Sequence, residues 1–248
     1  MKKILIFFGG CSTEYGVSLQ SAAAVLAHLD QSRYQPVLVG ITRQGAWRYY
    51  PGGPQEIAAD CWQPGSVPCL LDPSRGARRL ILLDENWTCL DFDAALPLLH
   101  GKNGEDGTIQ GLFQLSGIPY VGCNTLSSAV CMDKAVTHTL LSNADIEQAH
   151  YLWFYADRYF ADGEKIRNKI AARLNFPVFV KPANAGSSVG VSTVTAPANL
   201  VPPIRLAPEN DTTIAVHVVL LVLVLECAVL GNRVISVPSP LSVPGPSL

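Results

Sequence analysis

The stretch FPVFVKPANAGSSVGV, residues 176–191, decides the fold of the second half of the chain. Residues 176–180 form an apolar run that is too short for a helix. The run is bounded by Pro177 and Pro182, so it predicts a buried strand that delivers Lys181 at its end.

A loop of small residues follows this strand. Gly186 and Gly190 frame two hydroxyl groups, Ser187 and Ser188, and glycine lets a backbone come close to a ligand and offer its N–H groups. A strand that ends in a lysine and is followed by a glycine-serine loop is the kind of arrangement that can bind a polyphosphate. The pattern differs from the Walker motif, because Lys181 precedes the loop instead of closing it. A β-hairpin with a flexible glycine turn fits this segment equally well.

The N-terminus has the pattern of a β-α-β unit. Ile4–Phe8 is a continuous apolar run, typical of a parallel strand buried on both faces. Ser18 is expected to cap a helix whose apolar residues recur up to Leu29, and Pro36–Ile41 is the next strand. Glu14 lies in the first loop, where open α/β sheets bind ligands, and its carboxylate could pair with a substrate ammonium group. The alternative is a solvated loop acid.

A nicotinamide-dependent oxidoreductase is the first rival for such a unit. The glycines stand at positions 9, 10 and 16, which does not fit G-x-G-x-x-G. Thr42 and Arg43 stand where an acidic residue would end the second strand. The glycine pattern therefore disfavours a dinucleotide site.

A second cluster of polar residues follows the predicted strand Ala94–Leu99. The segment HGKNGEDG, residues 100–107, brings together a histidine, a lysine, two acids and three glycines, and it precedes a predicted helix over Ile109–Leu115. Such a set at the carboxyl end of a strand indicates a ligand site. A solvated turn with a hydrogen-bonded His100 is the alternative. Residues 117–121 are expected to form a further strand.

The middle of the chain is expected to link two units. Leu126–Asn143 has the pattern of one helix that carries Lys134, and a lysine on a helix is normally solvated. A strand is predicted from Tyr151, and a helix over Asp162–Leu174 precedes the stretch at 176–191.

Composition points to small-molecule chemistry. The chain has 248 residues, 48% of them hydrophobic, and a net charge of −2 without long runs of one sign, so neither nucleic acid nor a membrane is an expected partner. The eight apolar residues 218–225 are far fewer than the roughly 20 of a membrane helix. Seven scattered cysteines without a C-x-x-C pair favour reduced thiols and a cytoplasmic location. No metal or redox role is assigned to them.

Four ordered segments resemble one enzyme family. GGCSTEYGVSLQSA (9–22), LLHGKNGEDGTIQGLFQLSGIPYVGC (98–123), SSAVCMDK (127–134) and the stretch at 176–191 are similar to the D-alanine–D-alanine ligases of the ATP-grasp superfamily. ITRQGAWRYY (41–50) and GCNTLSSAVCMDK (122–134) look most like the vancomycin-resistance branch, in particular the D-alanine–D-serine type. The likeness covers about residues 1–200, with a further short match at 226–232.

The resemblance implies an α/β fold. It places an N-terminal pre-ATP-grasp, Rossmann-like parallel-sheet domain over residues 1–125 and an incomplete central ATP-grasp domain over 126–232, with a Pro/Ser-rich irregular tail over 233–248. The family joins two D-amino acids, D-alanine to D-alanine or D-serine, through an acyl phosphate for peptidoglycan precursors. It uses ATP and Mg²⁺, and its members are commonly homodimers.

The resemblance also implies roles for particular residues. Glu14 would hold the ammonium group of the first substrate, with Ser187 in a hydrogen-bond network with it. His100 would lie near the substrate carboxylate and the acyl phosphate, supported by Glu105. The residues expected to bind ATP phosphates are Lys134, Lys181, Gly186, Ser188 and Gly190. Two cations and a set of N–H groups agree with phosphoryl transfer, which needs positioning and positive charge.

The chain departs from the family in two places. Gly16 replaces a usual glutamate, and one carboxylate, Glu226, stands between residues 212 and 248. Alignment by eye puts His217 and Val224 where the family has acids for adenine and ribose. No counterpart of the Mg²⁺ ligands is recognisable, so no metal ligand is assigned. We therefore expect a truncated copy, with a frameshift downstream of about codon 195 as the hypothesis. A non-catalytic remnant that binds D-alanine or nucleotide weakly is the alternative function.

Overall fold

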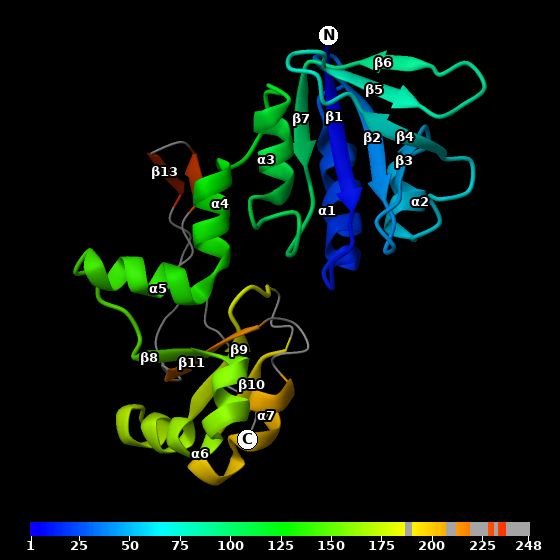
Figure 1. The fold of residues 1–248 in the computed structure, drawn as a ribbon. Helices are drawn as coiled ribbons and strands as arrows, with labels where there is room; N and C mark the ends of the chain where they lie inside the picture. The colour runs from blue at the N-terminus through cyan, green and yellow to red at the C-terminus, as the bar shows by residue number, and fades with distance from the viewer. Residues whose placement is uncertain (187–189, 207–211, 219–227, 231–232, 237–248) are drawn as a thin grey trace.

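The structure is a computed structural model of the chain, and it describes residues 1–186, 190–206, 212–218, 228–230 and 233–236. A seven-stranded sheet and a four-stranded sheet are joined by two helices (Figure 1). The predicted α/β class is confirmed.

The centre of the seven-stranded sheet is parallel. β1 (Lys2–Gly9) pairs with β2 (Tyr34–Ile41) on one side and with β7 (Ala94–Pro97) on the other. These are the three strands that the apolar runs predict. The segment expected as a strand over 117–121 makes only one parallel bridge, from Tyr120 to Ala95. Pro119 lacks the N–H group that a longer ladder needs.

Helices cover both faces of this parallel centre. Leu5 and Phe7 of β1 pack toward α3 (Thr108–Leu115), while Ile6 and Phe8 belong to a separate apolar cluster with α1 (Tyr15–His28). A strand buried on both faces explains the unbroken apolar run of β1.

Antiparallel strands extend the sheet from β2 to its edge, in the order β6-β5-β4-β3-β2. Most connections between consecutive strands here are short, and short connections cannot make parallel crossovers. The longer connection from β3 to β4 contains a helix, and these two strands are also antiparallel. The bounds of these elements are β3 (Trp47–Tyr50), α2 (Pro54–Ala58), β4 (Val67–Leu71), β5 (Arg79–Leu82) and β6 (Cys89–Asp91).

Two predictions about helices are wrong. Ser18 does not cap α1. It lies buried inside the helix, where its hydroxyl donates to the Leu98 carbonyl at 2.5 Å and accepts from the Gly9 N–H at 2.8 Å. The helix begins four residues earlier than predicted, at Tyr15, with Glu14 as its N-cap.

The single helix expected over 126–143 is two helices, α4 (Thr125–Met132) and α5 (Lys134–Asn143). Asp133 separates them in an extended conformation, and its carboxylate accepts the N–H groups of Ala135 and Val136. An aspartate in this conformation is a strong N-cap, and it starts a new helix.

The second sheet is antiparallel, in the order β10-β9-β11-β8, and α6 packs on it. The predicted helix at 162–174 is the second part of α6, which is kinked at Asp162. The bounds are β8 (Tyr151–Tyr155), α6 (Ala156–Arg173), β9 (Val178–Pro182), β10 (Ser192–Val194), α7 (Val201–Leu206) and β11 (Thr213–Val218), with a 3₁₀ turn at Pro197–Asn199.

The tail predicted as irregular from residue 233 begins with a strand. β13 (Arg233–Ser236) pairs with β12 (Ala228–Leu230). The β-branched residues Val234 and Ile235 precede the first proline of the tail, Pro238, so pairing is possible there. Residues 237–248, with Val224 and Glu226, lie outside the described residues.

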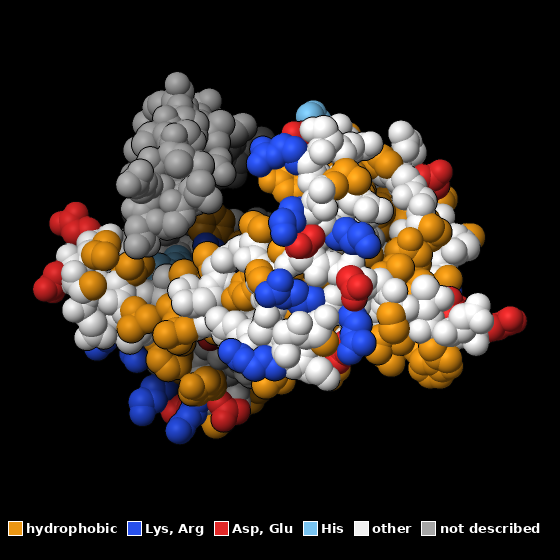
Figure 2. All heavy atoms as spheres, turned by 90° about the horizontal axis from the view of Figure 1, so that it is seen from above, with side chains coloured by type: hydrophobic (Ala, Val, Ile, Leu, Met, Phe, Trp, Pro, Cys, Tyr) orange, Lys and Arg blue, Asp and Glu red, His pale blue; other side chains and the backbone are white. Residues whose placement is uncertain are grey.

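Charged side chains are distributed over the surface without separation by sign. Figure 2 shows acidic and basic groups interspersed on the face seen from above. Among the described segments, none of the helices has the length and apolar character needed to cross a lipid bilayer.

Candidate active site

Glu14 lies where the chain leaves β1. Gly9 and Gly10 have φ angles of +85° and +111°, and a side chain at Gly9 would lie 2.3 Å from the Ile41 carbonyl oxygen. These glycines let the chain turn directly into α1, whose N-cap is Glu14. Glu14 is 5% exposed, so its carboxylate is buried at the N-terminal end of the helix.

Two glycine backbones from different loops lie against the Glu14 carboxylate. A Cβ at Gly101 would lie 2.1 Å from Glu14 Oε2, and one at Gly186 would lie 2.8 Å from the same oxygen. Gly101 follows β7 and Gly186 follows β9, so the two sheets meet at this carboxylate. Only residues without a side chain fit at these positions.

The Gly101 backbone is held by Glu105. The Glu105 carboxylate accepts the Gly101 N–H at 2.8 Å, and the Glu105 N–H donates to the Gly101 carbonyl at 2.9 Å. The acid at position 105 thereby shapes the loop that lies against Glu14.

A cavity of about 370 Å³ opens beside Glu14, with Arg43, Lys102 and Asn184 in its lining. The Arg43 guanidinium lies 3.9 Å from the centre of the Tyr15 ring and 3.4 Å from the Asp60 carboxylate. Burial and the hydrogen bond to Asp60 raise the pKa of Tyr15 to about 12, so Tyr15 stays neutral beneath Arg43. Lys102 belongs to the polar cluster predicted to bind a ligand, whereas no role was predicted for Arg43 and Asn184, since only the fold brings them to Glu14.

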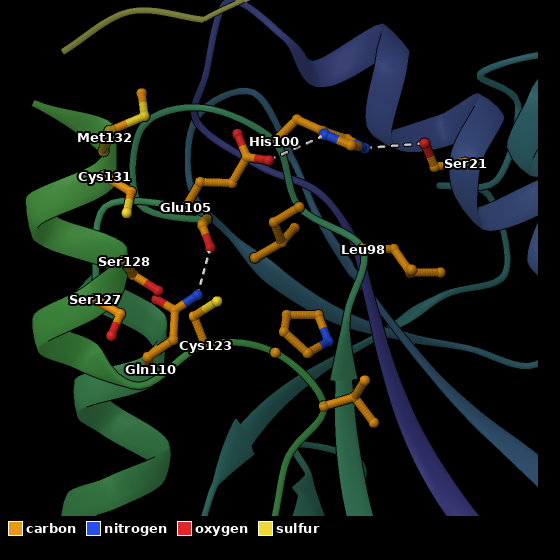
Figure 3. A pocket seen from close by; sticks show the side chains of 15 residues that line it. Ser21, Leu98, His100, Glu105, Gln110, Cys123, Ser127, Ser128, Cys131 and Met132 are labelled. Carbon is orange, nitrogen blue, oxygen red and sulfur yellow. Dashed lines mark hydrogen bonds and ion pairs between the residues drawn. The ribbon is translucent and has the colours of Figure 1, made fainter. Parts of the chain in front are cut away.

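His100 lies between α1 and its own loop (Figure 3). Its Nε2 is 2.9 Å from Ser21 Oγ, and its Nδ1 is 3.6 Å from Glu105 Oε1. The ring borders a cavity of about 570 Å³ between the 100–107 loop and α4. Gln110 lines the same cavity, where its Nε2 donates to the Gly104 carbonyl at 2.8 Å. His100 is thus oriented by two side chains and joined to the Glu14 site through Gly101.

Lys134 begins α5 and lies under the loop that follows β9. Its Nζ donates to the carbonyls of Ala183 and Ala185 at 3.1 and 2.5 Å, and its backbone N–H donates to Ala183 at 3.2 Å. Asn184 of this loop donates to Asp133 at 3.1 Å. The break at Asp133 therefore places Lys134 against the loop that leads into the glycine-serine segment. The sequence pattern had predicted one unbroken helix with a solvated Lys134.

Lys181 lies inside the second sheet. It is partly buried in β9 with its Nζ 5.3 Å from the centre of the Phe179 ring, and burial lowers its pKa. It forms no ion pair with any other residue that the structure describes. A desolvated ammonium in this state is chemically suited to an anionic group such as a phosphate.

His217 of β11 belongs to the same region. Burial, followed by the positive charge of Lys181, lowers its pKa to about 3. Its ring centre is 4.6 Å from that of His138, and its buried Nε2 has no hydrogen-bond partner among the described residues. The second sheet thus holds a cation and a neutral imidazole side by side.

The predicted site residues fall into two groups. One group contains Glu14, His100 and Gly186, and the other contains Lys134 and Lys181. Gly190 is described, with a φ of +69°, whereas Ser187 and Ser188 lie outside the described residues. No group of three or more His, Cys, Asp or Glu side chains within the described ranges could hold a metal ion, so no step is assigned to Mg²⁺.

Comparisons with known proteins identify the family. A model of the D-ala D-ala ligase N-terminus matches residues 3–123, and one of the D-ala D-ala ligase C-terminus matches residues 140–243. The second match extends beyond the residues on which the sequence resemblance rests and into the predicted tail. The fold and site thus define a protein of the D-alanine–D-alanine ligase type.

Three relatives illustrate the likeness. The chain is 41% identical to the D-alanine–D-alanine ligase of Caldicellulosiruptor bescii, over 96% of this chain and 65% of that protein. It is 40% identical to a putative D-alanine–D-lactate ligase of Streptomyces coelicolor, over 93% and 63%. The crystal structure of the VanG D-Ala:D-Ser ligase from Enterococcus faecalis superposes with a TM-score of 0.82 at 40% identity, covering 94% of this chain and 67% of that one. The chain belongs to the D-alanine–D-alanine ligase family, and it spans about 65% of the length of the first of these relatives.

Proposed function

We propose that this chain acts in the ATP-dependent joining of two D-amino acids, D-alanine to D-alanine or D-serine, for peptidoglycan precursors. The observation that carries the proposal is the Glu14 carboxylate, buried at the end of β1 and enclosed by backbone from both sheets. The ammonium group of an amino acid is a suitable ligand for a carboxylate in this position, because charge-assisted hydrogen bonds are stronger than those between neutral groups.

In this proposal the residues of the Glu14 site bind the first D-amino acid. Glu14 holds the ammonium of the first D-alanine, and the backbones of Gly101 and Gly186 lie against its carboxylate. His100, oriented by Ser21 and Glu105, supplies a donor near the substrate carboxylate. Ser187 completes the network around the first substrate.

Lys134 and Lys181 hold the phosphates of ATP, together with Gly186, Ser188 and Gly190. ATP supplies the phosphoryl group that activates the substrate carboxylate. The lysines neutralise charge on that group, which is the main demand of phosphoryl transfer. The desolvated state of Lys181 supports this role.

Relatives with D-serine and D-lactate specificity, and the vancomycin-resistance proteins VanA and VanB, support a place in the resistance branch as part of the proposal. A cytoplasmic location is supported by the six described cysteines, all of them free thiols. Mg²⁺ dependence and a homodimer complete the proposal.

The test is phosphate release by the purified chain from ATP and Mg²⁺, with and without D-alanine and D-serine. We expect release that depends on D-alanine and that Lys181→Ala lowers about tenfold or more, as loss of a charge-assisted contact predicts. Lys165→Ala, at an exposed lysine on α6, is the matched control. A folded chain that binds D-alanine in calorimetry without releasing phosphate would favour the weakly binding remnant instead.

A further inference from the structure

A third cavity lies at the carboxyl ends of the parallel strands, on the α3 side of the sheet. It has a volume of about 360 Å³ and is called here the Trp47 cavity. It is lined by Gly9 at the end of β1, by Gly10, and by Leu99 after β7. The chain passes from β1 to α1 on one face of the sheet and from β7 to α3 on the other face. The cavity therefore lies at the point between neighbouring strands where the helices switch from one face of the sheet to the other. Open α/β sheets bind ligands at such a point.

The floor of the Trp47 cavity is apolar. It is formed by Ile41, Trp47, Leu99, Ile109 and Leu112, of which Ile41, Leu99 and Ile109 are less than 8% exposed. The Trp47 ring is fixed by an edge contact to Phe7, with the ring centres 5.1 Å apart. Gly10 presents bare backbone to the cavity, and the nearest atom to a Cβ built there is a Leu99 methyl carbon, at 3.7 Å. The floor therefore suits a flat, ring-sized apolar body.

The rim carries one lysine and no acid. Lys102 lines the cavity and makes no ion pair with any described residue, and no Asp or Glu is among the described lining residues. The acids of the same loop are engaged elsewhere. Asp106 accepts the N–H groups of Asn103 and Thr108, and Glu105 accepts that of Gly101. The charge at the rim is thus positive and complementary to an anion.

From this lining we infer that the Trp47 cavity binds a small aromatic acid, with its ring on Trp47 and its anionic group on Lys102. The Trp47 cavity adjoins the Glu14 cavity and shares Cys11 and Lys102 with it, but Glu14 does not line the Trp47 cavity, and the inference does not depend on ligase activity.

The test uses naphthalene-2-sulfonate as the probe and the full chain. Cys11 is exposed and lines the cavity, whereas Cys61 and Cys89 are exposed outside it. We expect a saturating probe to slow alkylation of Cys11 by iodoacetamide about tenfold, read by peptide mass spectrometry, with Cys61 and Cys89 unchanged. Uncharged naphthalene should bind about tenfold more weakly, because a charge-assisted contact is lost.

Substitutions around the cavity show whether the probe binds in it. Thr108→Trp, at an exposed residue of the rim, should abolish protection of Cys11. Leu115→Trp, at a residue of the same helix that is 71% exposed and outside the cavity, should not. Lys102→Met should weaken binding about tenfold and Lys102→Arg should restore it. Cys11 and Lys102 also border the Glu14 cavity, so Glu14→Gln is included and should leave the affinity unchanged.

Equal protection of all three cysteines, or an affinity that Thr108→Trp does not alter, would overturn the inference. Loss of probe binding in Glu14→Gln would also overturn it, by moving the probe to the Glu14 cavity. A failure of phosphate release bears only on the proposed function, because none of these measurements needs turnover.

Discussion

The two sheets place their polar site groups in different ways. In the seven-stranded sheet Glu14 and His100 follow the ends of strands, and the strands themselves carry the apolar clusters. In the four-stranded sheet Lys181 and His217 lie on the strands, partly or fully buried. A group after a strand is oriented by its loop, whereas the burial of Lys181 and His217 within the sheet lowers their pKa values. Both sheets have an apolar core, and the second sheet is in addition sensitive to charge.

The largest expected effect tests the core of the first sheet. Phe7→Ala removes a fully buried ring that contacts Trp47 and Phe113, and we expect a loss of about 3–5 kcal/mol in the free energy of unfolding. Urea denaturation measures the loss, and hydrogen exchange should place it in β1, β2 and β7. Phe160→Ala, at a ring that is 64% exposed, should change stability by about 0.5 kcal/mol or less. Equal effects of the two variants would contradict the assignment of the core.

The next effect concerns the carboxylate between the sheets. Glu14→Gln keeps the shape but removes the charge, and on the proposed function D-alanine binding should weaken by about 1.5–3 kcal/mol. Isothermal titration calorimetry measures the affinity. The control is Glu85→Gln, at an exposed acid in the antiparallel part of the first sheet. Unchanged affinity in Glu14→Gln would exclude Glu14 as the ammonium site.

Acid should affect the second sheet through His217. Its imidazole has a pKa of about 3 in the folded chain, against about 6.5 when unfolded, so below pH 6.5 the unfolded chain binds a proton that the folded chain does not. The free energy of unfolding should be unaffected above pH 6.5 and should fall by about 2 kcal/mol by pH 5, continuing toward pH 3.

His217→Phe should remove this part of the pH dependence, measured by denaturation at pH 7 and pH 5. His28→Phe, at an exposed histidine of α1, is the control. A pH dependence that persists in His217→Phe would assign the acid sensitivity to other groups.

The smallest effect compares two helix caps. Asn124 accepts the Ser127 N–H and caps α4, whereas Asp133 caps α5 and also accepts a hydrogen bond from Asn184. We expect Asn124→Ala to cost about 1 kcal/mol and Asp133→Ala up to about 2 kcal/mol, measured by thermal denaturation. Asn184→Ala should lower the stability by the amount by which the cost of Asp133→Ala exceeds that of Asn124→Ala. Equal costs of the two cap variants would mean that the link to Asn184 adds no stability.

The parallel centre of the fold could be predicted because its signals are local. The apolar runs of β1, β2 and β7 and the glycines that follow β1 lie within short windows of sequence. The start of α1 was predicted wrongly, since Ser18 has the side chain of a cap but the fold buries its hydroxyl between Gly9 and Leu98. The break at Asp133 was missed because the apolar pattern continues through it, although an aspartate before Lys134 is itself a cap signal.

The candidate site could be predicted only in part, for a related reason. Glu14, His100 and Lys181 stand in motifs, and their residue types are informative on their own. Arg43 and Asn184 also lie in quoted segments, but their roles could not be predicted, because they come together with Glu14 only when the β2–β3 turn and the loop after β9 approach it. Contacts between residues so far apart in sequence are set by packing of the sheets, which local patterns do not encode.

The approach of Gly101 and Gly186 to one carboxylate has a thermodynamic consequence. A ligand bound at Glu14 contacts loops of both sheets, so it is released when either sheet unfolds. The sheet that unfolds at the lower temperature then gains the binding free energy, about 2.7 kcal/mol at a ligand concentration of 100 times Kd. If the unbound chain has two separate thermal transitions, added ligand would raise the lower one until it merges with the upper one.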